Sequence, residues 1–478
     1  MIRRFSARLL ASFLAAALAG PALAKTSKPA PAPDPGATAA ALRDKALADP
    51  TAYAIVSSLT TEVGARMAGS PVAARARDWG LAKLKALGFQ NVHAEPFTIT
   101  AWARGPESAE VIAPYPHTLA ILGLGRSVST PPEGIEAEVV LFHAYAEMLA
   151  AAPGSLAGKI AVVDQPMTRT QDGSGYGAAV VARTRGASEA ARRGAVAYLV
   201  RSISTSDSRL PHAGAMRYAG DAPQIPAAAL SVPDAELLDR MAAMGQPVRL
   251  KLVMTETTTP GASAWNVSGE IPGSENPDEV VVIGGHLDSW DPGEGAIDDG
   301  AGVAITTAAA KLIMGLPRHP RRTVRVVMFG AEEMDFSGPA YAEAHKDETA
   351  RIVATGESDV GADAIWSLQL PAGAVDAPAL KPLASVLAPL KIFIANEPAR
   401  FSGSDFAELS QAGVPAFAYR QDASRYFDWH HSADDTLDKV DPVSIRQNVA
   451  AWAALVYLIA DSDIDFRALA APPAPEHP

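Results

Sequence analysis

The sequence contains no cysteine among its 478 residues, and this absence removes several kinds of chemistry at once. Disulfide bonds, thiol nucleophiles, cysteine-ligated zinc and iron–sulfur clusters are all excluded. Histidine, aspartate and glutamate remain as the strong metal ligands that the chain offers. A metal site in this protein therefore has to be built from imidazoles and carboxylates.

Basic residues are in the minority. Lys and Arg number 41 against 53 Asp and Glu, which gives a formal net charge of −12 at pH 7. Nucleic-acid binding uses basic side chains to neutralise phosphates, so this balance argues against a nucleic-acid partner. Aromatic residues make up only 6% of the chain, but 48% of it is hydrophobic, which is ample for a buried core.

Long apolar runs are scarce, and the first of them lies at the N-terminus. Residues 1–24 combine three arginines, a short apolar run and an Ala-Leu-Ala ending, a pattern typical of a secretory signal peptide. A membrane-spanning helix needs roughly 20 apolar residues. We therefore expect cleavage near Ala24, export to the periplasm or the medium, and no stable membrane anchor here or later. Residues 25–37 are expected to form a Pro-rich linker and 466–478 a disordered tail.

The rest of the chain shows two different patterns of predicted secondary structure. Helical periodicity marks residues 72–87, and Gly88 follows as a helix terminator. From residue 257 onward, strands alternate with helices, and this alternation predicts an α/β fold in which a mixed, mostly parallel sheet is sandwiched by helices. The expected elements are strands at 279–283 and 323–329 and helices at 301–312 and 338–344. This pattern predicts a discontinuous α/β domain over 38–110 and 257–465, which the resemblance described below makes the catalytic domain.

Residues 111–256 differ from the segments on either side. Short β-rich runs recur there, with two expected helices at 184–193 and 234–244. We therefore expect an inserted β-rich domain within the catalytic domain. A basic cluster in this insert is interpreted as a solvated face, and its members are Arg183, Arg185, Arg192 and Arg193.

Histidines and acidic residues follow the predicted strands of the catalytic domain. His286 and Asp288 come directly after the first strand, and the pair Glu332-Glu333 follows the second. Because the carboxyl ends of parallel strands meet at one edge of a sheet, these side chains are expected to lie close together. Three later candidates are the pair Asp298-Asp299 at a helix start, Asp359 in a loop, and the pair His430-His431.

Each motif also has a purely structural interpretation. An aspartate at a helix start is a common N-cap, and two glutamates after a strand are usually a solvated turn. Together, however, the motifs supply ligand types suited to zinc and a carboxylate able to bridge two ions. Two ions about 3.5–4 Å apart can share one water and activate it. A carboxylate that is not a ligand can then take the proton, which gives a physical reason for adjacent glutamates.

The order of these motifs resembles the co-catalytic dizinc aminopeptidases. The resemblance rests on His286-Leu287-Asp288, Gly295–Gly300, Ala331-Glu332-Glu333, Glu357-Ser358-Asp359, His431 with Asp435-Thr436, and the early motif Gly64–Ser70. It implies two zinc ions, with His286 and Asp359 on one, Glu333 and His431 on the other, and Asp298 bridging them. It further implies that Glu332 is the general base, that Asp288 orients His286, and that Asp299 follows a cis peptide bond.

Three further residues receive less specific roles from the resemblance. His430 is left for substrate contact or for plain structure, Asp405 for a place behind the ligands, and Tyr426 for the substrate pocket. Residues 426–432 are closest to the carboxypeptidase Q subgroup, and the insert resembles its protease-associated domain. That subgroup includes homodimers, so a homodimer is one assembly that the analogy suggests.

The resemblance implies a zinc-dependent exopeptidase that removes N-terminal residues from short peptides or cleaves dipeptides. The insert is then expected to cover part of the cleft. Carboxypeptidase-type activity, a noncatalytic receptor of the same fold, and one-zinc acyl transfer as in glutaminyl cyclases stay open as alternatives. A serine hydrolase is disfavoured because the chain has no Gly-x-Ser-x-Gly motif.

Overall fold

The computed structural model describes residues 34–469. The predicted signal peptide lies outside this range, as do most of the predicted linker and of the predicted tail. Both predicted flexible segments stop short of their expected bounds, because α1 (Pro35–Ala46) and α12 (Phe466–Leu469) are helical. The reason is burial, since Gly36 of α1 and Phe466 of α12 lie inside the protein.

A five-stranded sheet in the order β1-β10-β12-β11-β13 organises the catalytic part. Its strands are β1 (Gln90–Ala103), β10 (Thr257–Ile271), β11 (Asn276–His286), β12 (Arg322–Phe329) and β13 (Ile352–Glu357). The mixed α/β class is confirmed. A mostly parallel sheet is not found, because only β11 pairs in parallel, with β12 and β13, whereas β10 runs antiparallel to β1 and β12.

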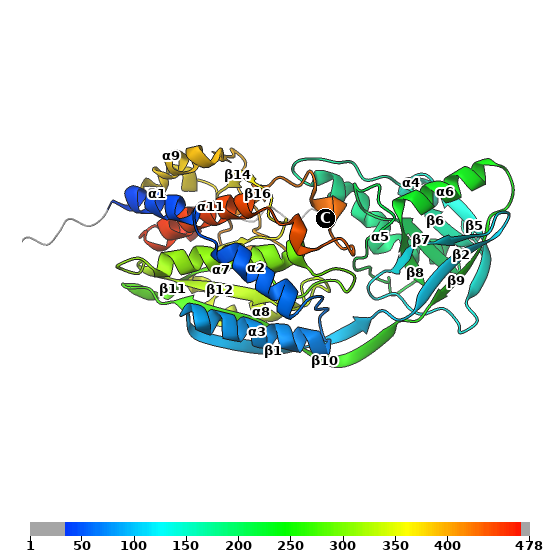
Figure 1. Ribbon diagram of the computed structural model, residues 1–478, viewed down its shortest axis with the longest axis horizontal. Coiled ribbons are helices and arrows are strands. Elements are labelled where there is room, and N and C mark those ends of the chain that lie inside the picture. Colours follow the sequence, from blue (N-terminus) through cyan, green and yellow to red (C-terminus); the bar gives the residue numbers. More distant parts are fainter. Residues whose placement is uncertain (1–33, 470–478) are drawn as a thin grey trace, which may run out of the picture. The chain divides into compact units, whose positions relative to one another are not determined.

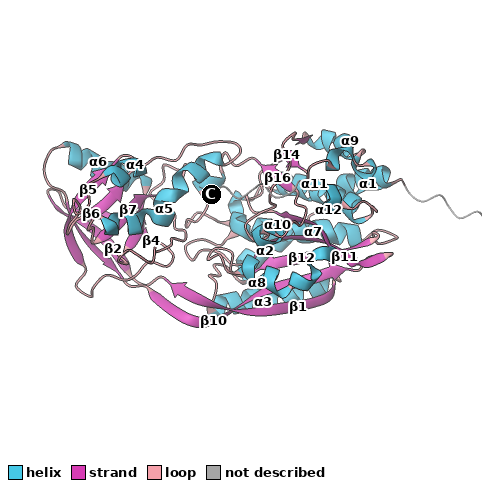
Figure 2. Ribbon diagram, turned by 180° about the vertical axis from the view of Figure 1, so that it is seen from behind, coloured by secondary structure: helices cyan, strands magenta, loops and turns pink. Residues whose placement is uncertain are grey.

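Helices cover both faces of this sheet (Figure 1). On one face, Val281 and Ile283 of β11 join a core with α2 (Thr51–Glu62), α7 (Ala301–Met314) and α11 (Pro442–Ala460). On the other face, which Figure 2 shows from behind, Val280 and Val282 pack with α8 (Ser337–Ala344) and α10 (Ala407–Gln411). Successive β11 side chains thus alternate between two cores, as the pleat of a strand requires.

Helix α3 (Pro71–Leu87) packs against β1 and β10 and matches the predicted helix closely. The hydroxyl of Ser70 accepts a hydrogen bond from Ala73 N at 3.1 Å and caps its first turn. Gly88 takes a left-handed conformation with φ 95°, which ends the helix as expected.

Helix α11 is long and apolar enough to cross a membrane, judged by length and composition. The expectation that no later stretch would be so was therefore wrong. In this structure most of the helix is buried, with Trp452 at its centre, and it packs against α1 and α7. These contacts are those of the core helix of a globular protein.

Residues 107–254 form an eight-stranded sheet in the order β3-β2-β9-β5-β6-β7-β8-β4. Strands β5 to β8 run parallel and the others pair antiparallel. The strands are β2 (Glu107–Ala113), β3 (His117–Leu119), β4 (Ile121–Gly123), β5 (Ile135–Phe142), β6 (Ile160–Val163), β7 (Ala197–Arg201), β8 (Ala227–Leu230) and β9 (Arg249–Met254). We call residues 107–254 the insert; β1 and β10 lead the chain into and out of it.

The helices of the insert are α4 (Tyr145–Ala150), α5 (Ser174–Arg192) and α6 (Val232–Ala243). Helix α5 begins well before the predicted start at residue 184. Its first turns contain Gly175 and Gly177, which carry no apolar periodicity, and this explains why the sequence pattern missed them.

A three-stranded sheet in the order β15-β14-β16 completes the catalytic part. Its strands are β14 (Ile365–Gln369), β15 (Phe393–Ile394) and β16 (Ala418–Gln421), and α9 (Leu383–Leu387) lies between the first two in sequence.

Candidate metal centre

Three neighbouring strands of the five-stranded sheet end at the candidate site. His286 is the last residue of β11 and pairs in register with Phe329, the last residue of β12. Glu332 and Glu333 follow β12 after a short turn, and Asp359 follows β13. The strand-end argument from the sequence therefore leads to the correct edge of the sheet.

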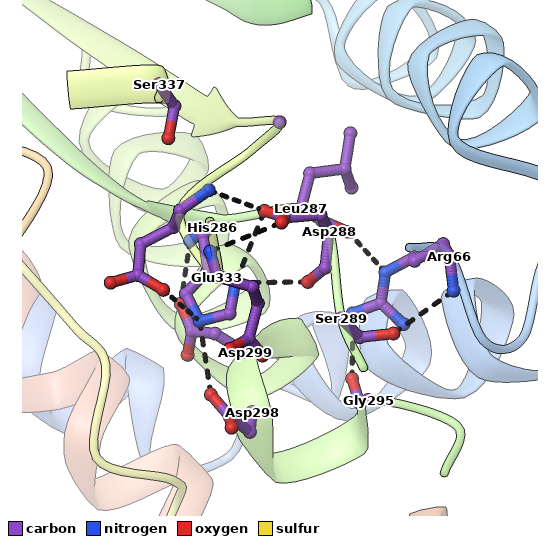
Figure 3. A network of polar contacts seen from close by, with 12 residues as sticks. Arg66, His286, Leu287, Asp288, Ser289, Gly295, Asp298, Asp299, Glu333 and Ser337 are labelled. Atoms are coloured by element: carbon purple, nitrogen blue, oxygen red, sulfur yellow. Dashed lines mark hydrogen bonds and ion pairs between the residues drawn. The ribbon is translucent and has the colours of Figure 1, made fainter. Parts of the chain in front are cut away.

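Asp298 stands between two histidines that come from distant parts of the chain. One of its oxygens, Oδ1, lies 3.1 Å from His286 Nε2, and the other, Oδ2, lies 3.2 Å from His431 Nε2. Figure 3 shows the carboxylate of Asp298 turned toward His286. A carboxylate with one oxygen toward each imidazole has the arrangement of a group that bridges two ions.

Two further carboxylates complete two ligand sets around Asp298. Asp359 Oδ1 lies 3.3 Å from His286 Nε2, and Glu333 Oε2 lies 3.1 Å from His431 Nε2. The donors are imidazole nitrogen and carboxylate oxygen, which suit zinc. Within residues 34–469, the buried atoms Asp298 Oδ2 and Glu333 Oε1 have no hydrogen-bond partner. Buried polar atoms left without a partner are costly, and a cation between the two ligand sets would satisfy them.

His430 and His431 are both close to Asp298, but they differ in their other neighbours. Their rings stack with centroids 3.5 Å apart, and His430 Nε2 lies 3.6 Å from Asp298 Oδ2. His431 alone of the two is paired with Glu333 in the described part of the chain. His430 instead packs among aromatic rings, with the Tyr176, Tyr426 and Phe427 centroids 5.0 to 5.3 Å away. The geometry thus favours His431 as the ligand.

Asp288 acts on the glutamate turn more than on His286. Its two carboxylate oxygens accept hydrogen bonds from Glu332 N at 3.0 Å and Glu333 N at 3.3 Å. The partner of His286 Nδ1 is the main-chain oxygen of Asp288, at 3.0 Å, while the carboxylate is 3.7 Å away. The main chain of Asp288 thus gives His286 its nearer partner, and the carboxylate also fixes the turn that carries both glutamates. That the Asp288 side chain orients His286 stays a prediction.

Asp299 stabilises the backbone on either side of Asp298. Its carboxylate accepts hydrogen bonds from His286 N at 2.9 Å and from Gly302 N at 3.0 Å, in the first turn of α7. The peptide bond between Asp298 and Asp299 is cis, as the resemblance implied. Asp299 therefore joins the end of β11 to the start of α7, on either side of the bridging position.

The remaining predicted residues surround Glu332. Ser404 Oγ donates a hydrogen bond of 2.6 Å to Glu332 Oε1, and Glu332 Oε2 lies 3.9 Å from His286 Nε2. Asp405 lies one step further out, because its Oδ1 accepts from Ser337 Oγ at 2.6 Å and its main-chain N–H donates to Glu357. Tyr426 lines the cavity in front of these groups.

Burial and mutual repulsion govern the protonation of this cluster. Burial raises the pKa of Glu332 well above its usual value, and the charges of Asp359 and Glu333 add to the effect. Burial also raises the pKa of Glu333, to about 7, although His431 opposes the shift. Burial would have the same effect on Asp298, but the surrounding histidines hold the pKa of Asp298 well below its usual value. The carboxylates are crowded enough to hold protons that bound cations would displace.

A cavity of about 560 Å³ opens onto the candidate centre. One part of its wall carries carboxylates, namely Asp298, Glu332, Glu333, Asp335 and Asp359. The part contributed by the insert carries Arg183, Arg185 and Arg217, with Tyr176 beside them. The two sides of this cavity therefore bear opposite charges.

Arg66 and Asp435 support the centre, although their sequence positions predicted no role for either residue. The buried Arg66 side chain donates to the main-chain oxygens of Leu287, Glu294 and Gly295, so it ties the loop after β11 together (Figure 3). Asp435 Oδ1 accepts from Ala296 N and Ile297 N at 2.8 and 2.7 Å. Both residues lay within quoted motifs, but nothing local in the sequence reveals partners so far along the chain.

The insert contacts the loop that carries His430 and His431. Ser204 Oγ donates to Phe427 O at 2.8 Å, and Thr205 Oγ1 donates to Asp428 Oδ1 at the same distance. Arg169 forms an ion pair with Asp428 at 2.7 Å. The expected basic face of α5 is also only partly solvated, because Arg183 is buried at 6% exposure.

Comparisons with known proteins agree with this arrangement. A model of peptidase family M28 matches residues 266–456. Carboxypeptidase Q of Bos taurus is 38% identical over 410 residues, which cover 86% of this chain and 85% of that protein. The human carboxypeptidase Q is 38% identical over 412 residues, with 86% and 85% covered.

Solved structures show the same likeness. The peptidase M28 precursor from Shewanella amazonensis SB2B has 42% sequence identity and a TM-score of 0.89, covering 92% of this chain and 99% of that one. A zinc aminopeptidase from Bacillus subtilis shares the fold at 17% identity and a TM-score of 0.62, covering 85% of this chain and 94% of that one.

Proposed function

Because this chain belongs to peptidase family M28 and is a metallo-exopeptidase, we propose that it cleaves dipeptides and other short peptides at a centre of two zinc ions. The observation that carries the proposal is the position of Asp298, with one carboxylate oxygen toward each of two histidines. His286 and Asp359 would hold one ion, Glu333 and His431 the other, and Asp298 both. Zinc bound there would lower the pKa of a water molecule and polarise the peptide carbonyl.

Glu332 is the proposed general base. It belongs to neither ligand set, and its Oε1 is held by Ser404 while its other oxygen faces His286. Asp288 fixes its backbone N–H, so the carboxylate is supported from two sides. Glu332 takes a proton from the attacking water and passes it to the nitrogen of the leaving amine. Burial raises the pKa of Glu332 well above its usual value, which makes its carboxylate a stronger base.

The two charged sides of the cavity support a substrate with both termini free. The carboxylates provide partners for an α-amino group, and Arg185 and Arg217 of the insert face the same space with the opposite charge. A cavity of about 560 Å³ is of the size that holds small ligands. On this basis we propose dipeptidase activity in first place, with carboxypeptidase activity on short peptides as the second candidate, since relatives bear the name carboxypeptidase Q.

A digest of matched peptides tests the proposal. The zinc-loaded protein is given one dipeptide and one tetrapeptide, each with free termini, with a blocked N-terminus, and with a C-terminal amide. Dipeptidase activity predicts cleavage of the free dipeptide and little of the other forms. Release of single C-terminal residues from the N-blocked tetrapeptide would favour the carboxypeptidase, and release of N-terminal residues from amidated peptides would favour an aminopeptidase. No hydrolysis of any peptide would contradict the proposal.

Two sequence-level alternatives are set aside. A noncatalytic receptor and a one-zinc acyl transferase do not agree with membership among the metallo-exopeptidases. Export through a signal peptide at residues 1–24, a protease-associated identity for the insert, and a homodimer stay proposals. The first is tested by N-terminal sequencing of protein from the periplasm or medium, where Lys25 is the expected first residue.

A further inference from the structure

His431 meets the insert on the side of its ring that faces away from Asp298. Its Nε2 points to Asp298 and Glu333, while its Nδ1 lies 3.3 Å from the main-chain oxygen of Ala213. Arg183 Nη1 also lies 3.5 Å from Nδ1, but the carbonyl oxygen is the nearer atom. A carbonyl oxygen only accepts hydrogen bonds, so Nδ1–H is the donor. This is the tautomer that leaves Nε2 free to bind a metal, and a metal-bound histidine commonly needs such a partner.

The carbonyl of Ala213 is itself held in place. Arg183 Nη1 donates to it at 3.3 Å, so the guanidinium and the imidazole share one acceptor. Ala213 N donates to His431 O at 2.9 Å, and His212 Nδ1 donates to His430 O at 2.6 Å. Residues 212–213 of the insert therefore form hydrogen bonds with residues 430–431 through both main-chain and side-chain atoms.

Arg183 is fixed in the position that this contact needs. Its Nη2 donates to Tyr176 OH at 2.7 Å, and the guanidinium carbon lies 5.5 Å from the centre of the Tyr176 ring. Gly214 has φ 133°, and a Cβ atom there would overlap the guanidinium, so only glycine lets Arg183 lie against this backbone. Among residues 34–469, Arg183 Nε has no hydrogen-bond partner, and no carboxylate forms an ion pair with the guanidinium, whose partners are Ala213 O and Tyr176 OH.

We propose that Arg183 is a positioning residue for the zinc ligand His431, acting through the carbonyl of Ala213. The inference rests on the proposed two-zinc function. A buried cation that forms no ion pair with an acid in its own domain is costly, so a role beyond stabilising the insert is needed to explain it. The role assigned here is to hold a carbonyl dipole against His431 Nδ1, which fixes the tautomer and the orientation of the ring. The insert thereby supplies part of the metal centre.

The test measures zinc binding, with no need for turnover. Wild type, Arg183→Gln and Arg192→Gln are loaded with zinc as full chains, then titrated with a chromophoric chelator while bound zinc is counted by atomic emission. Arg192 is the matched control, since it lies on the same helix, is more exposed, and pairs with Glu189 and Asp221 within the insert. Circular dichroism melts in excess zinc check the fold of each variant.

The proposal predicts a loss confined to one site. Arg183→Gln should keep one zinc at wild-type affinity and bind the other 10- to 100-fold more weakly, the usual cost of removing a group behind a metal ligand. Arg192→Gln should bind both as wild type does. Gly214→Ala, which displaces the guanidinium without changing its charge, should copy Arg183→Gln and serves as the second test if that variant fails to fold.

The outcomes separate the inference from the proposed function. A wild-type protein that binds a single zinc contradicts the two-zinc proposal itself. Two wild-type sites with unchanged affinities in both Arg183→Gln and Gly214→Ala overturn the inference alone. Equal weakening of both sites together with a lowered melting temperature also overturns it, because that is the result of a general structural role for Arg183.

Discussion

At the scale of single residues, Glu332 is held by groups that do not depend on its charge. Ser404 donates to its side chain, and Asp288 accepts from its main chain. Glu332→Gln keeps an oxygen for Ser404 but cannot take a proton from water. We expect kcat on a dipeptide to fall by about 10²- to 10⁴-fold, the range for a general base, with zinc content unchanged. Full activity with zinc bound would refute the assignment; Glu343→Gln on the exposed side of α8 is the control.

Glu256 gives a second prediction at this scale, one that concerns pH. It lies between β9 and β10. The pKa of Glu256 is raised from 4.5 to about 7, mainly by burial; the negative charge of the nearby Glu107 adds to the increase, and the positive charge of Arg104 opposes it. The folded protein therefore holds a proton that the unfolded chain releases, so stability falls as the pH rises from about 4.5 to about 7. Because the group is only half-buried, we expect a loss on the order of 1–2 kcal/mol.

Glu256→Gln should remove that loss. The variant is expected to match wild type near pH 4.5 and to exceed it at pH 8 in free energy of unfolding, measured by urea denaturation at both pH values. Glu110→Gln, on an exposed position of β2, is the control. A variant no more stable than wild type at pH 8 would show that Glu256 ionises without cost in the folded protein.

The candidate site shows which residues a sequence can reveal. His286 and Glu333 follow the ends of neighbouring strands, so the strand-end argument predicted that they lie close together, while the place of Asp298 between the ligands came from the family resemblance. Arg183 was misjudged as part of a solvated face, because its partner Ala213 is fixed by tertiary packing. The contacts of the Asp288 carboxylate with the main chain of Glu332 and Glu333 were not predicted for a similar reason, since they depend on how two strand ends pack together.

At the scale of elements, the start of α7 is packed without spare room. A Cβ atom on Gly302 would overlap both the carbonyl of Ser358 and the carboxylate of Asp299. Gly177, on an exposed turn of α5, has nothing within 4 Å of such an atom. The same substitution is therefore expected to have opposite effects at the two positions.

Gly302→Ala should destabilise the protein by about 1–3 kcal/mol through overpacking and weaken zinc binding by moving Asp299. Gly177→Ala should stabilise it by up to about 1 kcal/mol, since alanine favours a helix over glycine. Thermal melts and zinc content of both variants check this. Equal melting temperatures for the two variants would contradict the packing described here.

Helices and strands with regular apolar patterns were predictable from the sequence. Strands that form only because they pair with a distant strand were not. The amphipathic helix α3 and the apolar core strands β11 and β12 carry the periodicity that the sequence rules detect. Strand β1 was missed because nearly all of its residues are exposed or half-exposed, and its pairing with β10 depends on a segment far along the chain. Strand β10 was also not predicted, and its antiparallel pairing with β1 and β12 leaves the sheet with as many antiparallel as parallel pairs.

At the scale of the whole molecule, the crowded carboxylates make stability depend on metal. Ligand that binds only the folded state stabilises it, by about 4 kcal/mol for one site at a thousand times its Kd. We expect removal of zinc by a chelator to lower the melting temperature and readdition of zinc to restore it. Magnesium, which prefers oxygen ligands alone, should restore little of the lost melting temperature. A melting temperature unchanged by chelation would mean that the cluster folds as well without an ion.

The contacts between the insert and residues 426–431 bear on how such chains can be recombined. Ala213, Arg169 and Thr205 belong to one part of the sequence, and the loop that they hold belongs to another. If the insert were exchanged between two relatives, its contact residues would meet a loop whose sequence and shape fit a different insert. A chimera of this protein should therefore transplant residues 107–254 and 426–431 as one pair, although more than 170 residues of chain separate them (426 − 254 = 172).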